Sequence, residues 1–157
     1  MDTPYLNRDT IREDLAELLL GGFAPVVILL REFDFNKAGI VLEGLHFSAY
    51  SLLGHMHIRQ QTFLNFLQDP DSNQQVWPEA YWPQNFSPSN EQIWEQAISD
   101  FEKDLEKIIQ KVKDPLKNIF TKQANDKTIF WAVISNIQHN AYHIGQIKTI
   151  GRQLGVW

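Results

Sequence analysis

The sequence predicts an all-α fold: a four-helix bundle with a short extra helix and a long loop rich in tryptophan and proline. Apolar residues recur mainly at helical spacing, and strand-like alternation is almost absent. The chain has 157 residues, which suits one domain spanning 1–157. No internal repeat stands out, and a helical array would need one.

The first helix is predicted near the start of the chain. Thr10 and Glu13 have the spacing of a capping box, so a helix is expected to open there and to end at Gly21-Gly22. The next segment, 24–35, contains the run Val-Val-Ile-Leu-Leu, which is compatible with a buried strand or a short helix. The charged residues after this run and the neighbouring helices favour a short helix.

A long helix is predicted from about Ser48 to Gln68, ending before Asp69-Pro70, because a residue that precedes proline disfavours the helical conformation. The stretch 69–88 is then a loop that contains the aromatic segment Trp77–Pro83. A loop of this length tends to be functional or to serve as a cover. Aromatic clusters are mostly packing, so we expect the segment to cover the end of the bundle rather than the mouth of a cleft.

Two more long helices complete the predicted bundle. Ser89 and Gln92 have capping-box spacing, and Pro115 ends the helix that they open. The last helix is predicted from Thr128 to about Leu154, closed by the glycine that follows. Apolar residues of the earlier helix alternate in steps of four and three and form one stripe: Trp94, Ile98, Phe101, Leu105, Ile108 and Val112.

Composition excludes several kinds of function. The chain has no cysteine, which rules out disulfides, thiolate metal sites and a catalytic cysteine and fits a reducing, cytoplasmic setting. Its 19 acidic residues outnumber its 14 scattered basic ones, giving a net charge of -5, so nucleic-acid binding is not expected. The acidic start does not resemble a signal peptide, and no apolar stretch is long enough to cross a membrane.

Five histidines are the candidates for a functional site. His139 and His143 are separated by four residues of one predicted helix, so they differ by only about 40° around its axis. His55 flanks the apolar stripe of another helix and is the best third member. His57 is about 200° away from His55, and His46 also projects away, so an exposed or capping role is expected for both.

Three imidazoles that meet in space can bind one zinc-like ion and leave a coordination position open. A histidine pair at this spacing can also be an accident of the surface, and a single helical histidine is often a hydrogen-bonded core residue, so the spacing alone leaves both interpretations open. One rival is disfavoured. A zinc protease of the His-Glu-x-x-His type needs a glutamate as its general base, and Asn140 occupies that position here.

The segments that carry these histidines resemble the DNA-damage-inducible (DinB-like) family. The segment 139–147 and the following 152–157 resemble the family's C-terminal signature. The segment 52–56, Leu-Leu-Gly-His-Met, resembles its second-helix motif, and 77–83 resembles the loop of one subgroup. The similarity spans nearly the whole chain, in order.

The resemblance implies a four-helix bundle that binds a divalent metal, zinc or nickel, through His55, His139 and His143, and that tends to form homodimers. Some relatives are thiol-dependent transferases or isomerases, which implies a small-molecule substrate such as a low-molecular-weight thiol. One departure is Pro25, where relatives in the subgroup often have a histidine. That difference implies a lost or altered substrate contact and leaves the three expected ligands unchanged.

The chemistry of such a site leaves alternatives. A metal on three imidazoles can activate water, which supports a hydrolase, or bind a thiol as its thiolate, which supports thiol transfer. A non-catalytic metal-binding stress-response module is the third alternative. No general base is assigned. Gln146 is expected to hold an imidazole, Tyr142 to pack against a neighbouring helix, and Arg59 to form a surface salt bridge at least as readily as to hold an anionic substrate.

Overall fold

The computed structural model describes residues 8–69, 79–123 and 126–157. These residues form five α-helices and two short 3-10 helices, with no strand among them, which confirms the all-α prediction. The α-helices are α1 (Arg8–Leu19), α2 (Val26–Arg31), α3 (Ala49–Gln68), α4 (Glu91–Lys113) and α5 (Ile129–Gln153); the 3-10 helices are η1 (Phe35–Lys37) and η2 (Glu79–Tyr81).

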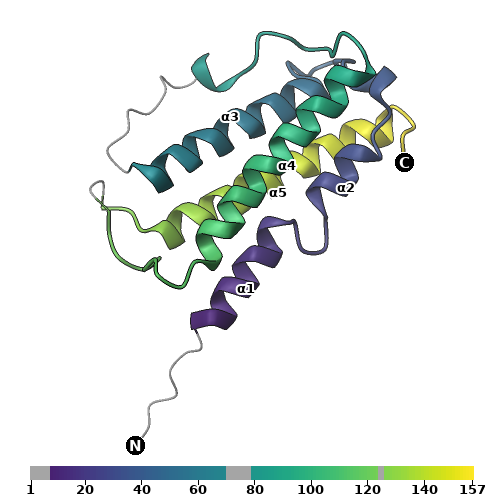
Figure 1. Ribbon diagram of the computed structural model, residues 1–157. Coiled ribbons are helices and arrows are strands. Elements are labelled where there is room, and N and C mark those ends of the chain that lie inside the picture. Colours follow the sequence, from purple (N-terminus) through teal and green to yellow (C-terminus); the bar gives the residue numbers. More distant parts are fainter. Residues whose placement is uncertain (1–7, 70–78, 124–125) are drawn as a thin grey trace, which may run out of the picture.

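The long helices α3, α4 and α5 lie side by side, and α3 packs against both of the others (Figure 1). The shorter α1 and α2 each contact α4 and α5 as well. They are separated by a turn in which Gly21 has a φ of 106°, a conformation that favours glycine. The predicted helix end at Gly21-Gly22 and the predicted short helix in 24–35 are therefore both confirmed.

Apolar side chains from all five helices fill one continuous core. The predicted stripe of α4 is confirmed, because every one of its six residues is buried. Among the described residues, no helix is both long and apolar enough to cross a bilayer.

Two of the four predicted helix starts are confirmed by the structure, and two are wrong. Ser48 caps α3 in a capping box, and Thr128 caps α5. Thr10 does not cap α1, because the helix already includes Arg8. Ser89 does not cap α4 either: the neighbouring Asn90 accepts a hydrogen bond from the Ile93 amide at 2.9 Å. Asparagine is at least as good an N-cap as serine, so the cap lies one residue later than predicted.

Arg12 joins α1 to the far end of α4. Its buried guanidinium donates hydrogen bonds to the carbonyls of Val112 and Lys117, both at 2.5 Å. Carbonyls at the end of a helix lack partners within the helix, so a cation there satisfies them and also opposes the negative end of the helix dipole.

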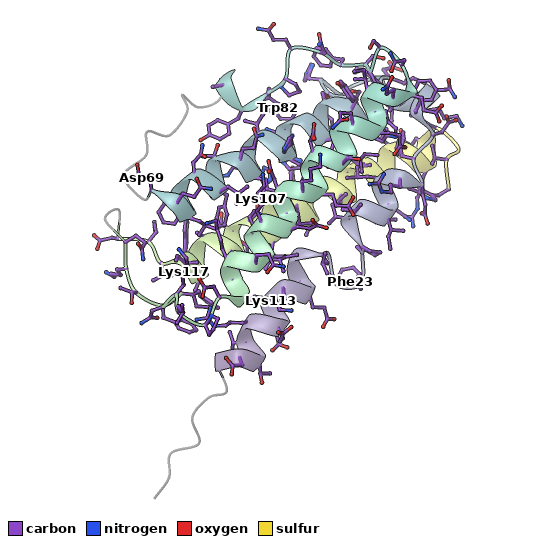
Figure 2. All side chains as sticks on the ribbon, in the orientation of Figure 1. Phe23, Asp69, Trp82, Lys107, Lys113 and Lys117 are labelled. Atoms are coloured by element: carbon purple, nitrogen blue, oxygen red, sulfur yellow. The ribbon has the colours of Figure 1, made fainter. Side chains whose placement is uncertain are left out.

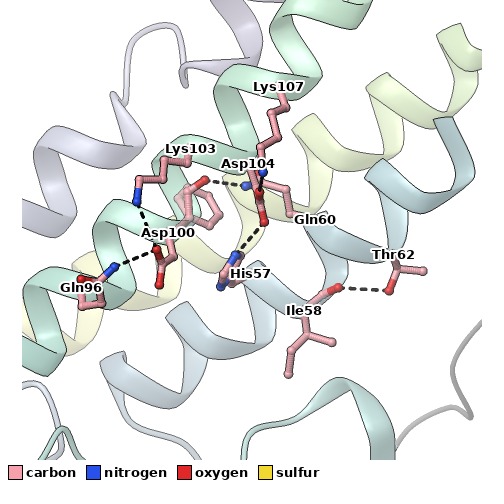
Figure 3. Close-up of polar contacts among 10 residues, drawn as sticks. His57, Ile58, Gln60, Thr62, Gln96, Asp100, Lys103, Asp104 and Lys107 are labelled. Atoms are coloured by element: carbon pink, nitrogen blue, oxygen red, sulfur yellow. Dashed lines mark hydrogen bonds and ion pairs between the residues drawn. The ribbon is translucent and has the colours of Figure 1, made fainter. Parts of the chain in front are cut away.

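A polar cluster joins α3 to α4 (Figure 3). His57 Nε2 lies 2.9 Å from Asp104 Oδ2, and Lys107 Nζ lies 2.8 Å from Oδ1 of the same carboxylate. Burial alone would raise the pKa of Asp104, but hydrogen bonds and charge from Lys107 and His57 lower it below its usual value. The expectation of an exposed or capping role for His57 is therefore wrong: this residue binds a carboxylate between two helices.

Candidate metal centre

The three histidines selected from the sequence meet between α3 and α5. Ring centroids lie 4.9 Å apart for His55 and His139, 4.7 Å for His55 and His143, and 4.5 Å for His139 and His143. One ring nitrogen of each residue lies within 4.8 Å of those of the other two. In the described part of the chain, this cluster contains no carboxylate. The three residues can therefore hold one metal ion with imidazole nitrogen alone.

Helix geometry and packing together produce the cluster. His139 and His143 stand one turn apart on α5, as their spacing predicted. His55 lies within the buried face of α3, which packs directly against α5, and it is only 3% exposed. His46, by contrast, is exposed and outside the cluster, as expected.

His55 is oriented by the last residue of η2 and the residue that follows it. Its Nδ1–H donates to the Tyr81 carbonyl at 2.6 Å, so Nε2 keeps its lone pair and faces the cluster. The Trp82 ring stacks on the imidazole with centroids 4.2 Å apart and planes at 12° (Figure 2 labels Trp82). The prediction that this aromatic loop covers only the end of the bundle is therefore wrong for Tyr81 and Trp82; residues 77 and 78 lie outside the described residues.

A glycine on α3 allows this segment to approach so closely. A Cβ atom added to Gly54 would lie 2.8 Å from Cγ and 3.2 Å from Cβ of Pro83. Both distances are shorter than ordinary van der Waals contact. Because Gly54 precedes His55, the same close contact that seats Pro83 also places the Tyr81 carbonyl and the Trp82 ring against the imidazole. We did not predict from the sequence that Gly54 allows this close contact, although the Gly-His and Trp-Pro pairs that form it are both present in the sequence.

His143 is oriented from its own helix. Its Nδ1–H donates to Gln146 Oε1 at 2.7 Å, which confirms the prediction that Gln146 holds an imidazole. Tyr142 is 65% exposed, and its hydroxyl lies 3.5 Å from Gln146 Nε2. The prediction that Tyr142 packs against a neighbouring helix is therefore wrong. Its ring instead lies edge-on to His143, with centroids 5.0 Å apart.

Arg59, one turn beyond His55 on α3, also departs from the expected surface salt bridge. Its guanidinium lies 5.8 Å from the centroid of the Tyr81 ring. No carboxylate pairs with Arg59 among the residues that the structure describes. Burial is the main cause that lowers the pKa of His55 and of His139, and the positive charge of Arg59 adds to it.

The ring nitrogens of His139 are poorly partnered. Its Nε2 lies 3.0 Å from His55 Nε2; its buried Nδ1 has the Asn140 side chain near enough to act on the pKa of His139, but no hydrogen bond of ordinary geometry is formed. If Nε2 carries the proton, it donates to His55 and leaves the Nδ1 lone pair unsatisfied. If Nδ1 carries it, a buried N–H is unsatisfied and two lone pairs face each other. A buried polar group without a partner costs about 1–3 kcal/mol, so either tautomer is unfavourable.

Burial keeps the cluster uncharged near neutral pH. It lowers the pKa of His139 from 6.5 to about 3, helped by the neighbouring His143 and His55. It lowers the pKa of His143 to about 4, although the hydrogen bond to Gln146 opposes this shift. Burial also lowers the pKa of His55, while the Tyr81 carbonyl acts in the opposite direction. Neutral imidazoles are the form that binds metal ions.

A cavity of about 330 Å³ lies beside the residues that contact His143, although no cluster histidine lines it. Gln146 and Tyr142 form part of its wall, so the residue that orients His143 also faces this space. Leu45 and Phe47 supply apolar surface, and Glu43 supplies one carboxylate. The cavity thus offers a mixed apolar and polar environment next to the histidines, as small-molecule sites commonly do.

Comparisons with protein-family models, with curated proteins and with solved structures give no match for this chain. Its class is therefore defined by fold and site alone. It is an all-helical protein in which two helices bring two buried histidines and one half-buried histidine together in an arrangement that can hold a metal ion.

Proposed function

We propose that this protein is a metal-dependent enzyme of the DinB-like kind, in which His55, His139 and His143 bind one zinc or nickel ion. The proposed fold is a four-helix bundle in which α1 and α2 together take one position. Support for this arrangement comes from the contacts that both short helices make with α4 and α5.

The donor set fits a divalent ion. Zinc–nitrogen bonds are about 2.0–2.1 Å, so two nitrogens on one ion must lie within about 4.2 Å of each other. The 3.0 Å between Nε2 of His55 and Nε2 of His139 meets this requirement, and a ring nitrogen of His143 lies within 4.8 Å of both residues' nitrogens. Outer hydrogen bonds from His55 and His143 leave their Nε2 lone pairs free for the ion, and a metal ion on Nε2 of both His55 and His139 would also remove the repulsion between their facing lone pairs.

A reactive metal site is favoured over a structural one. Structural zinc usually has four protein ligands, whereas three leave a position for another molecule. A divalent ion held there would act as a Lewis acid that lowers the pKa of a water or thiol in the open position. The adjoining cavity gives such a molecule a place to bind.

Within this class we propose transfer of a low-molecular-weight thiol to an electrophile. The thiol loses its proton to solvent, sulfur forms a bond to the electrophilic carbon, and the leaving group departs with the electrons of its broken bond. Gln146 and Tyr142 would position the substrate, because both face the cavity and both contact His143 or its hydrogen-bond partner. The observation that carries the proposal is the group of three histidines, which in the described part of the chain includes no fourth histidine or carboxylate.

Metal binding is tested by elemental analysis of the purified protein after incubation with zinc or nickel and gel filtration. Wild-type protein should retain about one ion per chain. His55→Ala, His139→Ala and His143→Ala should each lose most of it, while His46→Ala, which removes an exposed histidine outside the cluster, should not. Retention of a full equivalent by all three cluster variants would refute the site.

Thiol chemistry is tested separately with cobalt-substituted protein. Adding a small thiol should produce a sulfur-to-cobalt charge-transfer absorption, and an aryl halide should then be converted to the thioether at a rate that depends on metal. If thiol produces no absorption change while an activated ester is hydrolysed, the hydrolase alternative is correct. If neither reaction occurs in protein that binds metal, the enzyme proposal fails.

A further inference from the structure

A second cavity, of about 550 Å³, lies between the α1–α2 connection and α5, away from the histidines. Its walls are mainly apolar and include Leu18, Leu29, Ile137 and Ile144. Phe23 also lines it and is fully exposed on the connection (Figure 2). On α5 the lining extends from residue 137 to residue 152, a distance of about 22 Å at 1.5 Å per residue. We call this feature the α5 groove.

One end of the α5 groove carries two positive charges. Lys148 and Arg152 both line it and stand one helical turn apart. Lys148 lies 4.3 Å from the centroid of the Trp157 ring, and neither cation is paired with a carboxylate among the described residues. No Asp or Glu lines the groove, although the whole chain has a net charge of -5. This local excess of positive charge favours an anion.

We propose that the α5 groove binds a single-chain amphiphile with a carboxylate head, such as a medium-chain fatty acid. The apolar walls would contact the hydrocarbon chain, and Lys148 and Arg152 would bind the carboxylate. A purely apolar ligand would leave both cations without a partner, and a small anion would leave the length of apolar wall uncovered. No cluster histidine lines the groove, and the experiment below distinguishes binding in the groove from binding at the metal site.

Isothermal titration calorimetry with decanoate below its micelle concentration tests the proposal. Wild-type protein should bind one decanoate per chain, whereas acetate, which lacks the chain, and decyltrimethylammonium, which reverses the charge, should bind at least about tenfold more weakly. His139→Ala should bind decanoate as wild type does. That result separates the groove from the metal centre, where a carboxylate could also bind.

Two variants test the two halves of the groove. Lys148→Gln/Arg152→Gln should weaken decanoate binding at least about tenfold, because charge-assisted hydrogen bonds to the head are lost. Leu18→Glu should weaken it similarly by placing a negative charge in the wall without disturbing the core, since Leu18 is 47% exposed. Lys103→Gln/Lys122→Gln removes two cations outside the groove and is the matched control. Circular dichroism should show native helix content in each.

Two outcomes would overturn the proposal. Equal binding of decanoate by the Lys148→Gln/Arg152→Gln variant and by wild type would show that the cations do not recognise the head. Sedimentation that shows a dimer, dissociated by Leu18→Glu, together with no decanoate binding, would show that a second copy of the chain covers the groove.

Discussion

Replacing Gly54 with alanine should weaken metal binding without touching a metal ligand. The added Cβ would lie 2.8, 3.2 and 3.5 Å from three ring carbons of Pro83. Ordinary contact begins at about 3.4 Å, so the proline must move by roughly 0.6 Å or more. Tyr81 and Trp82 immediately precede Pro83, and we expect them to move with it away from His55.

The expected magnitudes separate stability from metal affinity. Alanine in place of glycine within a helix stabilises it by about 0.8–1 kcal/mol. Overpacking costs about 1–3 kcal/mol, so the net loss of folding free energy should be no more than about 2 kcal/mol. Loss of an outer hydrogen bond to a metal-bound histidine typically lowers metal affinity by about 10–100-fold. Gly54→Ala should therefore remain folded and bind zinc or nickel about 10–100-fold more weakly.

Competition with a chromophoric chelator measures the affinity, and urea denaturation of the metal-free protein measures stability. Gly145→Ala is the matched control, because a Cβ there meets nothing within 4 Å. It makes the same substitution within α5, two residues from His143, and should increase stability by up to about 1 kcal/mol while leaving metal affinity unchanged. If Gly54→Ala and Gly145→Ala bind metal equally well, the docked segment does not support His55 and the reasoning is wrong.

Three further predictions concern pH and two buried charges. In metal-free protein, the folded-state pKa values of His139 and His143, about 3 and about 4, lie below the ordinary 6.5, so the unfolded chain binds more protons between these values. The free energy of unfolding should therefore fall on acidification from about pH 6.5 to about pH 4, with a slope of up to about 1.4 kcal/mol per pH unit for each histidine. Urea denaturation of wild type and of His139→Ala at several pH values measures this slope. If the free energy of unfolding has the same pH slope in both proteins, the prediction is wrong. Asp104→Asn should cost about 1–3 kcal/mol of stability in the same assay and leave metal affinity unchanged. Asp100→Asn changes a more exposed carboxylate and should have little effect on stability. Loss of metal binding in Asp104→Asn would show that the polar cluster also supports the metal site. Arg12→Ala should cost about 2–4 kcal/mol of stability, because it leaves one carbonyl in the last turn of α4 and one just beyond the helix without their donors. Arg12→Lys should recover part of this loss, and a cost below about 1 kcal/mol would mean that water replaces the guanidinium.

Helices and their buried faces were predictable from the sequence because the signals are local. The apolar stripe of α4 follows from its spacing alone, and a serine or threonine cap marks the start of α3 and of α5. The start of α4 was predicted wrongly because two residues that favour an N-cap lie next to each other. Ser89 and Asn90 are both good caps, and the backbone between them decides which one is used.

The candidate site was predictable in part for the same reason. The four-residue spacing of His139 and His143 predicts that both lie on one face of a helix. The position of His55 at the edge of an apolar stripe predicts that it contacts them from another helix. The contacts that orient the rings were only partly visible. Gln146 is on the same helix as His143 and could be identified, whereas the Tyr81 carbonyl and the Trp82 ring reach His55 across 26 and 27 residues of chain. No local pattern encodes that contact.

His57 illustrates how a correct geometric argument can give an incomplete result. Its angular distance from His55 places it outside the cluster, and the structure agrees. The opposite side of α3, however, faces α4, where Asp104 lies within hydrogen-bonding distance. A helix that packs against neighbours on two sides has two buried faces. A side chain that points away from one of these faces can therefore still be buried in the other.

The metal-free cluster is an energetic cost that folding alone does not recover. Three uncharged imidazoles are held close together, and when His139 carries its proton on Nδ1, the lone pairs of Nε2 of His55 and Nε2 of His139 face each other at 3.0 Å. Filling these positions with apolar residues would remove that penalty, whereas a metal ion removes it by accepting both lone pairs. A site that binds metal only when folded transfers the binding free energy to stability, by about 2.7 kcal/mol when free metal is 100 times the dissociation constant. The orientation of His55 therefore supports metal binding more than the proximity of three histidines alone, because its Nδ1–H is held by the Tyr81 carbonyl and its Nε2 lone pair points at Nε2 of His139.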